Sequence, residues 1–306
     1  MPVFQTILVP LDGSSLSEQA IPYASTLAQD DSKIVLLQVV PELHGNVATE
    51  IDLAYGWSQQ AEEVVASKIR SDLEAHAKDL KEMYAFAEVP AVRVILGDPA
   101  ATILETAQHV RADLIVMTTR GQGAAKRFIL GSVTDRVAHH STTPVFVFRP
   151  NDNAIVGQQA AIRRIIVPLD GSALAENALP MASALAQQLG VPILLARALQ
   201  LSMSMPVVAG TLLVPQQSID ETFQLATDYL TATREPLVNK GLTVATLTEW
   251  GTPFDVIDGI SGTEDLIMLT SHGRGGFQRW LLGSVADKLM HSSSAPVLLI
   301  PVRTGN

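Results

Sequence analysis

The stretch SHGRGGFQRWLLGSV (residues 271–285) decides the architecture, because the chain contains nearly the same text once before, as TRGQGAAKRFILGSV at residues 119–133. Two further matches occur in the same order: TILVPLDGSSLSEQAIPYASTLAQ at 6–29 with RIIVPLDGSALAENALPMASALAQ at 164–187, and GSVTDRVAHHSTTPVFVF from Gly131 with GSVADKLMHSSSAPVLLI from Gly283. Chance does not produce collinear matches of this length, so the sequence predicts a tandem duplication. We expect domains at 1–152 and 160–306, joined by the polar segment PNDNAIVGQQAA at 150–161.

Composition limits the class of partner. A formal net charge of −10 makes nucleic acid a poor candidate, because no basic footprint matches a phosphate backbone. The chain has no cysteine, which excludes disulfides and thiolate metal sites and is typical of a reducing compartment. The N-terminus resembles no signal peptide, and the long uncharged run at 198–219 is interrupted by Pro206 and Pro215. We expect a cytoplasmic protein with no membrane partner.

Each half alternates between apolar strands and helices. In the first half we expect strands at 4–10, 34–40, 89–96, 114–118 and 145–148, and helices at 15–30, about 59–84, 99–110 and 132–140. Ser15 and Glu18 have the spacing of a capping box for the first of these helices. In the second half we expect strands near Ile165, Ile193, Val244, Leu266 and Val297, and a loop at 200–215. This pattern predicts an α/β fold with two tandem doubly wound parallel five-stranded sheets, Rossmann-like in the strand order 3-2-1-4-5.

Polar motifs follow the first and fourth strands of each half, which flank the point where the strand order reverses. Asp12 and Asp170 come directly after the first strands, and the glycine loops follow the fourth strands and end at Gly131 and Gly283. Backbone N–H groups at the helix that starts there favour an anion, and a carboxylate opposite suits hydroxyl or amine donors. Together they suit a nucleotide. Taken singly, each motif is more often structural: DGS after a strand is typical of a turn with an N-cap serine, and Gly-Ser is typical of a helix start.

Other polar residues have structural interpretations. Asp113 and Asp265 open the fourth strands, and Asp135 and Asp287 lie in a first helical turn, where negative charge suits the helix dipole. The pair at 139–140, two histidines near a helix C-terminus, indicates a dipole or surface role rather than a metal site. No P-loop, GxSxG or HExxH motif is present, and GxGxxG is missing after the first strand. We therefore assign no catalytic and no metal-ligating residue.

The chain resembles the universal stress protein family in its tandem two-domain form, over essentially its whole length. The family's ATP-binding signature is Gly-x2-Gly-x9-Gly-Ser/Thr, and its last three positions are matched in both halves. Thr118 and Thr270 stand where the signature has its first glycine. The resemblance implies a fold like that of the adenine nucleotide alpha hydrolases.

The resemblance also implies a set of nucleotide-binding residues in each half. In the first half they are Pro10, Asp12, Val40, Met117, Thr118, Gly121, Gly131, Ser132 and Val133. In the second half they are Pro168, Asp170, Ala198 (with Leu199 as the alternative counterpart of Val40), Leu269, Thr270, Gly273, Gly283, Ser284 and Val285. ATP would be the cofactor, with Mg²⁺ or Mn²⁺ held by its phosphates.

The expected function is that of an ATP-binding stress-response regulator or sensor, with at most slow ATP hydrolysis. Two alternatives stay open: a stress scaffold or chaperone-like protein that binds no nucleotide, and a weak ATPase that uses Asp12 or Asp170. The family also implies an intramolecular pseudo-dimer through the fifth strands, and it leaves room for a homodimer.

Overall fold

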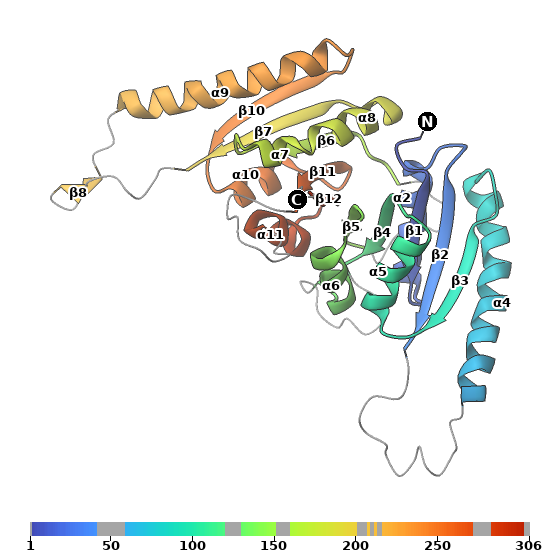
Figure 1. The fold of residues 1–306 in the computed structure, drawn as a ribbon. Helices are drawn as coiled ribbons and strands as arrows, with labels where there is room; N and C mark the ends of the chain where they lie inside the picture. Colours follow the sequence, from blue (N-terminus) through green and yellow to red (C-terminus); the bar gives the residue numbers. More distant parts are fainter. Residues whose placement is uncertain are drawn as a thin grey trace. The chain divides into compact units, whose positions relative to one another are not determined.

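A computed structural model describes residues 2–41, 59–119, 130–150, 160–200, 207–208, 211–212, 216–271 and 283–302. The chain divides into two compact units, Met1–Ala161 and Ile162–Asn306. Each unit is built around its own parallel sheet (Figure 1). Within the described ranges, no helix combines the length and the apolar composition needed to cross a bilayer.

The first unit alternates strands and helices along its whole length. In chain order its elements are β1 (Thr6–Leu11), α1 (Ser15–Glu18), α2 (Ala20–Leu27), β2 (Lys33–Val40), α4 (Gln59–Tyr84), β3 (Ala91–Leu96), α5 (Pro99–His109), β4 (Leu114–Thr118), α6 (Ser132–His140) and β5 (Val145–Phe148).

The second unit repeats this sequence of elements with one addition. Its elements are β6 (Arg164–Pro168), α7 (Ala173–Glu176), α8 (Leu179–Leu189), β7 (Ile193–Leu199), β8 (Val207–Val208), β9 (Thr211–Leu212), α9 (Gln216–Val238), β10 (Val244–Trp250), α10 (Pro253–Ile260), β11 (Asp265–Thr270), α11 (Ser284–Ser292) and β12 (Val297–Ile300). The added strands β8 and β9 form a short antiparallel pair in the segment that we predicted to be a loop.

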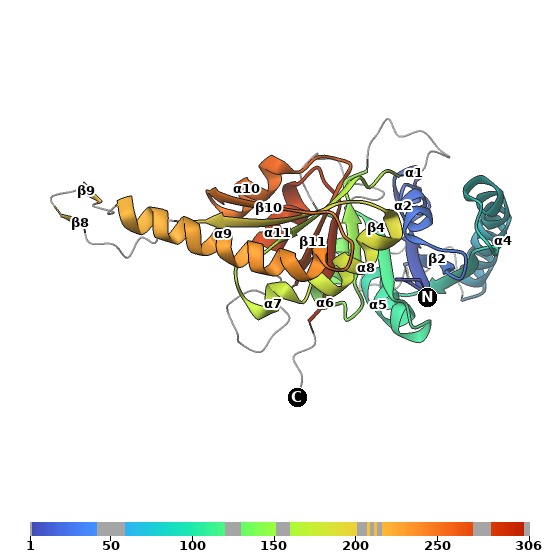
Figure 2. The ribbon, with the colours of Figure 1, turned by 90° about the horizontal axis from the view of Figure 1, so that it is seen from above.

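The strand order confirms the predicted fold class. In the first unit the strands run β3-β2-β1-β4-β5, and in the second β10-β7-β6-β11-β12, which is the order 3-2-1-4-5 in both. The pairings within each set of five strands are parallel, with registers such as Val9↔Leu36 and Ile166↔Leu194. Because right-handed crossovers place helices on both faces, the central strands are buried on two sides. Figure 2 shows α2 and α5 on opposite sides of the first sheet, and α8 and α10 on opposite sides of the second.

Turn and cap residues set the ends of the helices. Asp98 accepts a hydrogen bond from the N–H of Ala101 at the start of α5, and Thr252 accepts one from Asp255 at the start of α10. In both helices the next residue is a proline, whose missing N–H costs nothing at that position. Helix α8 ends at Gly190, which has a φ of 67° and so takes the left-handed conformation that other residues avoid.

The prediction of one continuous helix at 15–30 with a capping box at Ser15 and Glu18 was wrong. The N-cap is Ser14, whose side chain accepts from the N–H of Ser17, and the helix is interrupted at Gln19. The physical reason is Pro22, which has no N–H to donate to the carbonyl of the residue four places earlier. The second unit breaks in the same place, between α7 and α8, where Pro180 plays the same part.

Candidate functional site

The aspartates that follow the first strands are held in tight turns. The Oδ1 atom of Asp12 accepts hydrogen bonds from the backbone N–H of Ser14 at 3.0 Å and from its hydroxyl at 2.6 Å. In the second unit Asp170 Oδ1 accepts the N–H of Ser172 at 2.9 Å. Between aspartate and serine stands a glycine with a positive φ, 80° at Gly13 and 83° at Gly171. The DGS motifs therefore form the N-capping turns that the sequence allowed, with the carboxylates at the carboxyl edge of each sheet.

The helices that follow the fourth strands begin with exposed backbone donors. Gly131 is the N-cap of α6, with φ −64° and ψ 140° and no side-chain cap, and its N–H donates to the carbonyl of Thr119. The first N–H of α6 with a helical acceptor is that of Asp135, which donates to Gly131. In the described part of the chain, the N–H groups of Ser132 and Val133 make no hydrogen bond. This helix end suits an anion, because unpaired N–H groups and the helix dipole act together.

The second unit has the same arrangement at α11. Gly283 is the N-cap, with φ −63° and ψ 145°, and its N–H donates to Ser271 at 2.9 Å. Ser284 is exposed, as is Ser132, so neither serine hydroxyl caps its helix. A Cβ at Gly131 would lie 3.2 Å from the carbonyl oxygen of Thr119, so a larger residue there would require a small shift of this backbone.

Strand pairing brings the aspartate turn and the helix N-terminus of each unit to the same edge of its sheet. Strand β1 pairs with β4, and β6 with β11, so their carboxyl ends lie next to one another. Between the two motifs, Thr118 and Thr270 are buried at the ends of β4 and β11, as are Met117 and Leu269 before them. The hydroxyl of Thr134 donates to the carbonyl of Thr118 at 2.8 Å and fixes the start of α6 to the end of β4. The threonines in place of glycine are thus packed within the fold.

The ends of the second strands are matched by register. The carbonyl of Val40 accepts the N–H of Gly97 at 3.0 Å, and the carbonyl of Leu199 accepts the N–H of Gly251 at 2.9 Å. Leu199 is therefore the structural counterpart of Val40, and the alternative, Ala198, lies one residue earlier in β7. Pro10 and Pro168 stand near the carboxyl ends of β1 and β6, level with Leu37 and Ala196.

Some predicted positions lie outside the described residues. These are Gly121 and Gly273 in the glycine loops. The nucleotide-binding role of all predicted residues stays a prediction.

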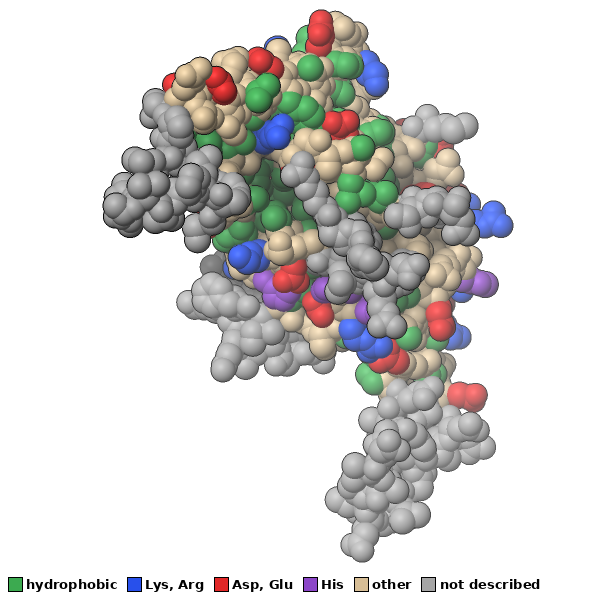
Figure 3. Space-filling view, turned by 60° about the vertical axis from the view of Figure 1, so that its left-hand side comes forward, with side chains coloured by type: hydrophobic (Ala, Val, Ile, Leu, Met, Phe, Trp, Pro, Cys, Tyr) green, Lys and Arg blue, Asp and Glu red, His purple; other side chains and the backbone are tan. Residues whose placement is uncertain are grey.

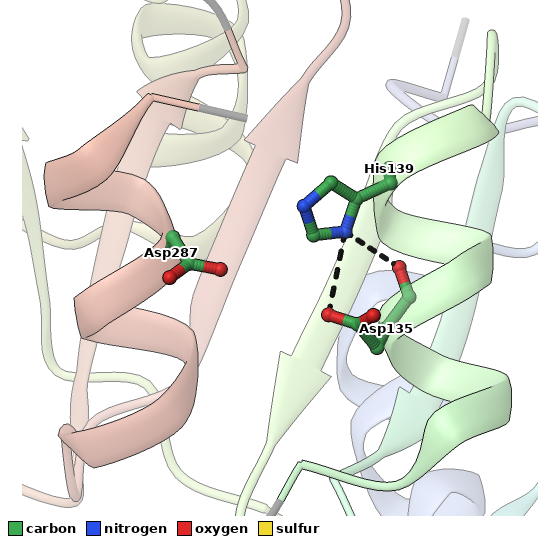
Figure 4. A group of neighbouring side chains, drawn as sticks. All are labelled: Asp135, His139 and Asp287. Carbon is green, nitrogen blue, oxygen red and sulfur yellow. Dashed lines mark hydrogen bonds and ion pairs between the residues drawn. The ribbon is translucent and has the colours of Figure 1, made fainter. Parts of the chain in front are cut away.

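The histidines near the C-terminal ends of α6 and α11 form hydrogen bonds within their own helices. His139 Nδ1 lies 2.8 Å from the carbonyl oxygen of Asp135 and 3.4 Å from its Oδ1 (Figure 4). On α11, His291 Nδ1 lies 2.8 Å from the carbonyl oxygen of Asp287 and 3.5 Å from its carboxylate. A carbonyl only accepts, so in both histidines Nδ1 carries a proton and donates to the carbonyl four residues earlier in the same helix.

A polar cluster that the sequence analysis missed lies beside the Asp170 turn. The hydroxyl of Tyr229 donates to Glu176 Oε1 at 2.8 Å, and the guanidinium of Arg197 lies over the tyrosine ring, 4.8 Å from its centroid. The matched pair in the first unit is Glu18 with His76, whose Nε2 is 3.7 Å from the carboxylate. An arginine inside the apolar strand ILLARAL was the one available signal.

Comparisons with known proteins agree in one family. The model of the universal stress protein family matches residues 4–149 and 161–301. The chain is 25% identical over 300 residues to a universal stress protein of Mycobacterium tuberculosis strain H37Rv, covering 96% of both chains. It is 31% identical over 153 residues to a universal stress protein of Thermus aquaticus, covering 48% of this chain and 100% of that one.

A solved structure has the same fold over both units. The crystal structure of a universal stress protein from Archaeoglobus fulgidus superposes with a TM-score of 0.64 at 22% sequence identity. The match covers 97% of this chain and 98% of that chain.

Proposed function

We propose that this chain, which belongs to the universal stress protein family, binds an adenine nucleotide in each of its two units. Bound ATP would make the protein a nucleotide-dependent regulator or sensor in the stress response rather than an efficient enzyme. Divalent metal, Mg²⁺ or Mn²⁺, would arrive with the phosphates.

One observation carries this proposal. In each unit, a carboxylate turn and a helix N-terminus follow two neighbouring strands at the same edge of the sheet, and the first N–H groups of that helix have no acceptor among the described residues. The helix end provides donors for phosphate oxygens, and the carboxylate accepts from hydroxyl or amino groups. A ligand with phosphate at one end and a sugar and base at the other satisfies both.

The chemistry of the predicted residues supports binding better than turnover. Asp12 and Asp170 are the titratable side chains among them. Each accepts an N–H from its own turn, and this hydrogen bond holds the carboxylate in place as an acceptor. Hydrolysis by Asp12 or Asp170 stays the alternative.

A calorimetric titration of nucleotide-stripped protein with ATP and Mg²⁺ tests the proposal through its stoichiometry. We expect two sites per chain. Absence of binding at millimolar ATP would overturn the proposal and favour the scaffold role. ATP turnover that Asp12→Asn abolishes while binding persists would establish the enzymatic alternative.

A pair of substitutions tests the helix end directly. Ser132→Pro removes one backbone N–H at the first helical position, where proline is favoured, and the φ and ψ of Gly131 suit a residue before proline. Ser132→Ala removes the same hydroxyl and keeps the N–H. We expect Ser132→Pro to weaken the first site by about tenfold or more relative to Ser132→Ala, because it removes a hydrogen bond to a charged oxygen. Ser284→Pro and Ser284→Ala make the matched test in the second unit.

The assembly and the location of the protein remain part of the proposal. The lack of cysteine supports a cytoplasmic location. The pseudo-dimer through the fifth strands, and any further homodimer, stay predictions that follow from the family.

A further inference from the structure

Arg197 occupies an unusual place in the second unit. It lies in β7 level with Thr248 of β10, and its guanidinium reaches over the loop that follows β6. A Cβ at Gly171 would lie 3.1 Å from one terminal nitrogen of Arg197 and 3.2 Å from the other. Gly171 separates Asp170 from the N-cap Ser172, so the cation is next to the carboxylate turn of the proposed site.

Among the described residues, the cation is held by packing against an aromatic ring. Its guanidinium lies over the ring of Tyr229, whose hydroxyl is anchored on Glu176. Burial, followed by the hydrogen bond to Glu176, raises the pKa of Tyr229 to about 12, so the phenol is neutral and keeps donating at physiological pH. A ring fixed in this way orients the planar guanidinium.

The hydrogen-bond donors of Arg197 are not used within the described residues. Neither a hydrogen bond nor an ion pair of this side chain occurs there, whereas Arg164 pairs with Asp265, Arg163 with Glu264 and Arg136 with Asp98. Arg197 is also half-buried in a protein with a net charge of −10. Acidic side chains lie on the outer surface of α9 (Figure 3), yet none forms an ion pair with it in the described ranges. Within the described residues, the five N–H groups of this side chain therefore have no protein acceptor and can donate to a ligand.

The first unit lacks this cation. The strand registers place Gln38 of β2 where β7 has Arg197, since Gln38 is level with Leu11 and Arg197 follows the residue level with Pro168. His76 and Glu18 stand where the second unit has Tyr229 and Glu176. At this place, beside the turn after the first strand, the two units therefore differ by one positive charge.

We infer that Arg197 binds a phosphate group on the ribose of the nucleotide in the second unit, which would make that unit selective for ribose-phosphorylated adenine nucleotides. This inference rests on the proposed function. The guanidinium lies beside the turn that follows β6, and α11 begins after the neighbouring strand β11, so the two groups of donors follow adjacent strands, whose spacing is about 5 Å. One ribose with two phosphates spans such a separation.

The position of the arginine supports this choice of ligand by analogy. In dinucleotide-binding folds of similar strand order, an arginine near the end of the second strand accommodates a phosphate on the ribose. Arginine suits this role because its planar fork matches phosphate oxygens in a bidentate manner.

The test compares three ligands on the full chain: AMP, adenosine 3′,5′-bisphosphate and adenosine 2′,5′-bisphosphate. The Ser132→Pro background weakens the first unit, so the tighter site belongs to the second. We expect one of the bisphosphates to bind about tenfold to a hundredfold more tightly than AMP, as expected for hydrogen bonds between charged groups. The position of the preferred phosphate identifies which ribose oxygen carries it.

Arg197→Gln introduces the residue that the first unit has at this position. We expect it to reduce the ratio of the affinity for the preferred bisphosphate to the affinity for AMP to about one. Arg163→Gln removes an exposed arginine of the same unit, paired with Glu264, and is the matched control, for which the ratio should persist. Should Arg197→Gln fail to fold, Arg197→Lys keeps the charge without the stacked fork, and the ratio should fall in part.

The outcomes separate the inference from the proposed function. Two results would overturn the inference and leave the proposed function standing. One is that the protein binds AMP and both bisphosphates with equal affinity. The other is that the preference for a bisphosphate over AMP persists in Arg197→Gln. No binding of any of the three ligands would overturn both.

Discussion

The two units build one sheet topology from different side chains. In the first unit the ring of Tyr23 contacts Phe146 at 5.0 Å and Phe148 at 4.4 Å between centroids. The repeated sequence places aliphatic residues at the matched positions of the second unit, namely Met181, Leu298 and Ile300. The residues from the fifth strands are buried in both units, and Tyr23 and Met181 are half-buried, so the same fold accepts aromatic side chains in one unit and aliphatic ones in the other.

A repeated residue does not imply a repeated contact. Asp113 directly precedes β4 and accepts the N–H groups of Gln5 and Thr6, each at 2.9 Å. Its counterpart Asp265 instead accepts two hydrogen bonds from Arg164, at 2.9 and 2.7 Å. The reason is the partner strand, which has a threonine at this position in the first unit and an arginine in the second. The same caution applies to the proposed sites, where the repeated Asp-Gly-Ser turn has different neighbours in the two units.

The largest expected effect tests the difference between the cores. Phe146→Ala should destabilise the first unit by about 3–5 kcal/mol, because the ring is fully buried and its removal leaves a cavity. Phe146→Leu, which introduces the residue of the second unit, should cost less because it fills part of the volume. Urea unfolding followed by circular dichroism, with limited proteolysis to assign the transitions, measures both.

Val64→Ala is the control for this comparison, since Val64 is 69% exposed. If Phe146→Ala were no more destabilising than Val64→Ala, the aromatic cluster would contribute nothing to the first core.

A smaller effect is expected at the glycines with positive φ. Gly190→Ala should cost about 1–2 kcal/mol from backbone strain alone, because a Cβ there meets nothing within 4 Å. Gly171→Ala should cost more, because its Cβ would press on the guanidinium of Arg197. The double variant Gly171→Ala/Arg197→Gln should recover the stability that Gly171→Ala loses beyond the cost of Gly190→Ala. Thermal unfolding of the wild type and these three variants would measure this. Equal costs for Gly171→Ala and Gly190→Ala would show that Arg197 yields without strain.

The smallest effect concerns pH and the second unit alone. The pKa of Tyr229 is raised from 10.0 to about 12, mainly by burial. A pKa that is higher in the folded state adds stability that is complete below pH 10 and is lost as pH rises from 10 to 12. Tyr229→Phe should lose this pH dependence, which unfolding at a series of pH values would detect.

Absorbance at high pH provides the direct measurement. Burial also raises the pKa of Tyr23, so the difference between the wild-type and Tyr229→Phe titrations isolates Tyr229. A midpoint near 10 in that difference would contradict the burial of Tyr229 and its hydrogen bond to Glu176.

Much of the fold could be predicted because its signals are local and repeated. The bounds predicted for α4, β4, α6 and β5 agree with the structure. These elements could be located because the apolar pattern of each and the turn residues that flank it are both local features of the sequence. The interruption after α1 was missed although Pro22 was visible, because the apolar pattern continues across it. The counterpart of Val40 was ambiguous, because only the hydrogen bond between Gly251 and Leu199 establishes the register.

The sequence by itself determined the duplication, the strand order and the two motifs that meet at the edge of each sheet. Those features follow from patterns within short segments, and from the rule that crossovers between parallel strands are right-handed. Only the tertiary structure decided the surroundings of the motifs. Arg197 is 26 residues from Gly171 and 32 from Tyr229 in the chain, so no local pattern indicates that they touch. Contacts between side chains far apart in sequence depend on register and packing, which are properties of the whole folded unit.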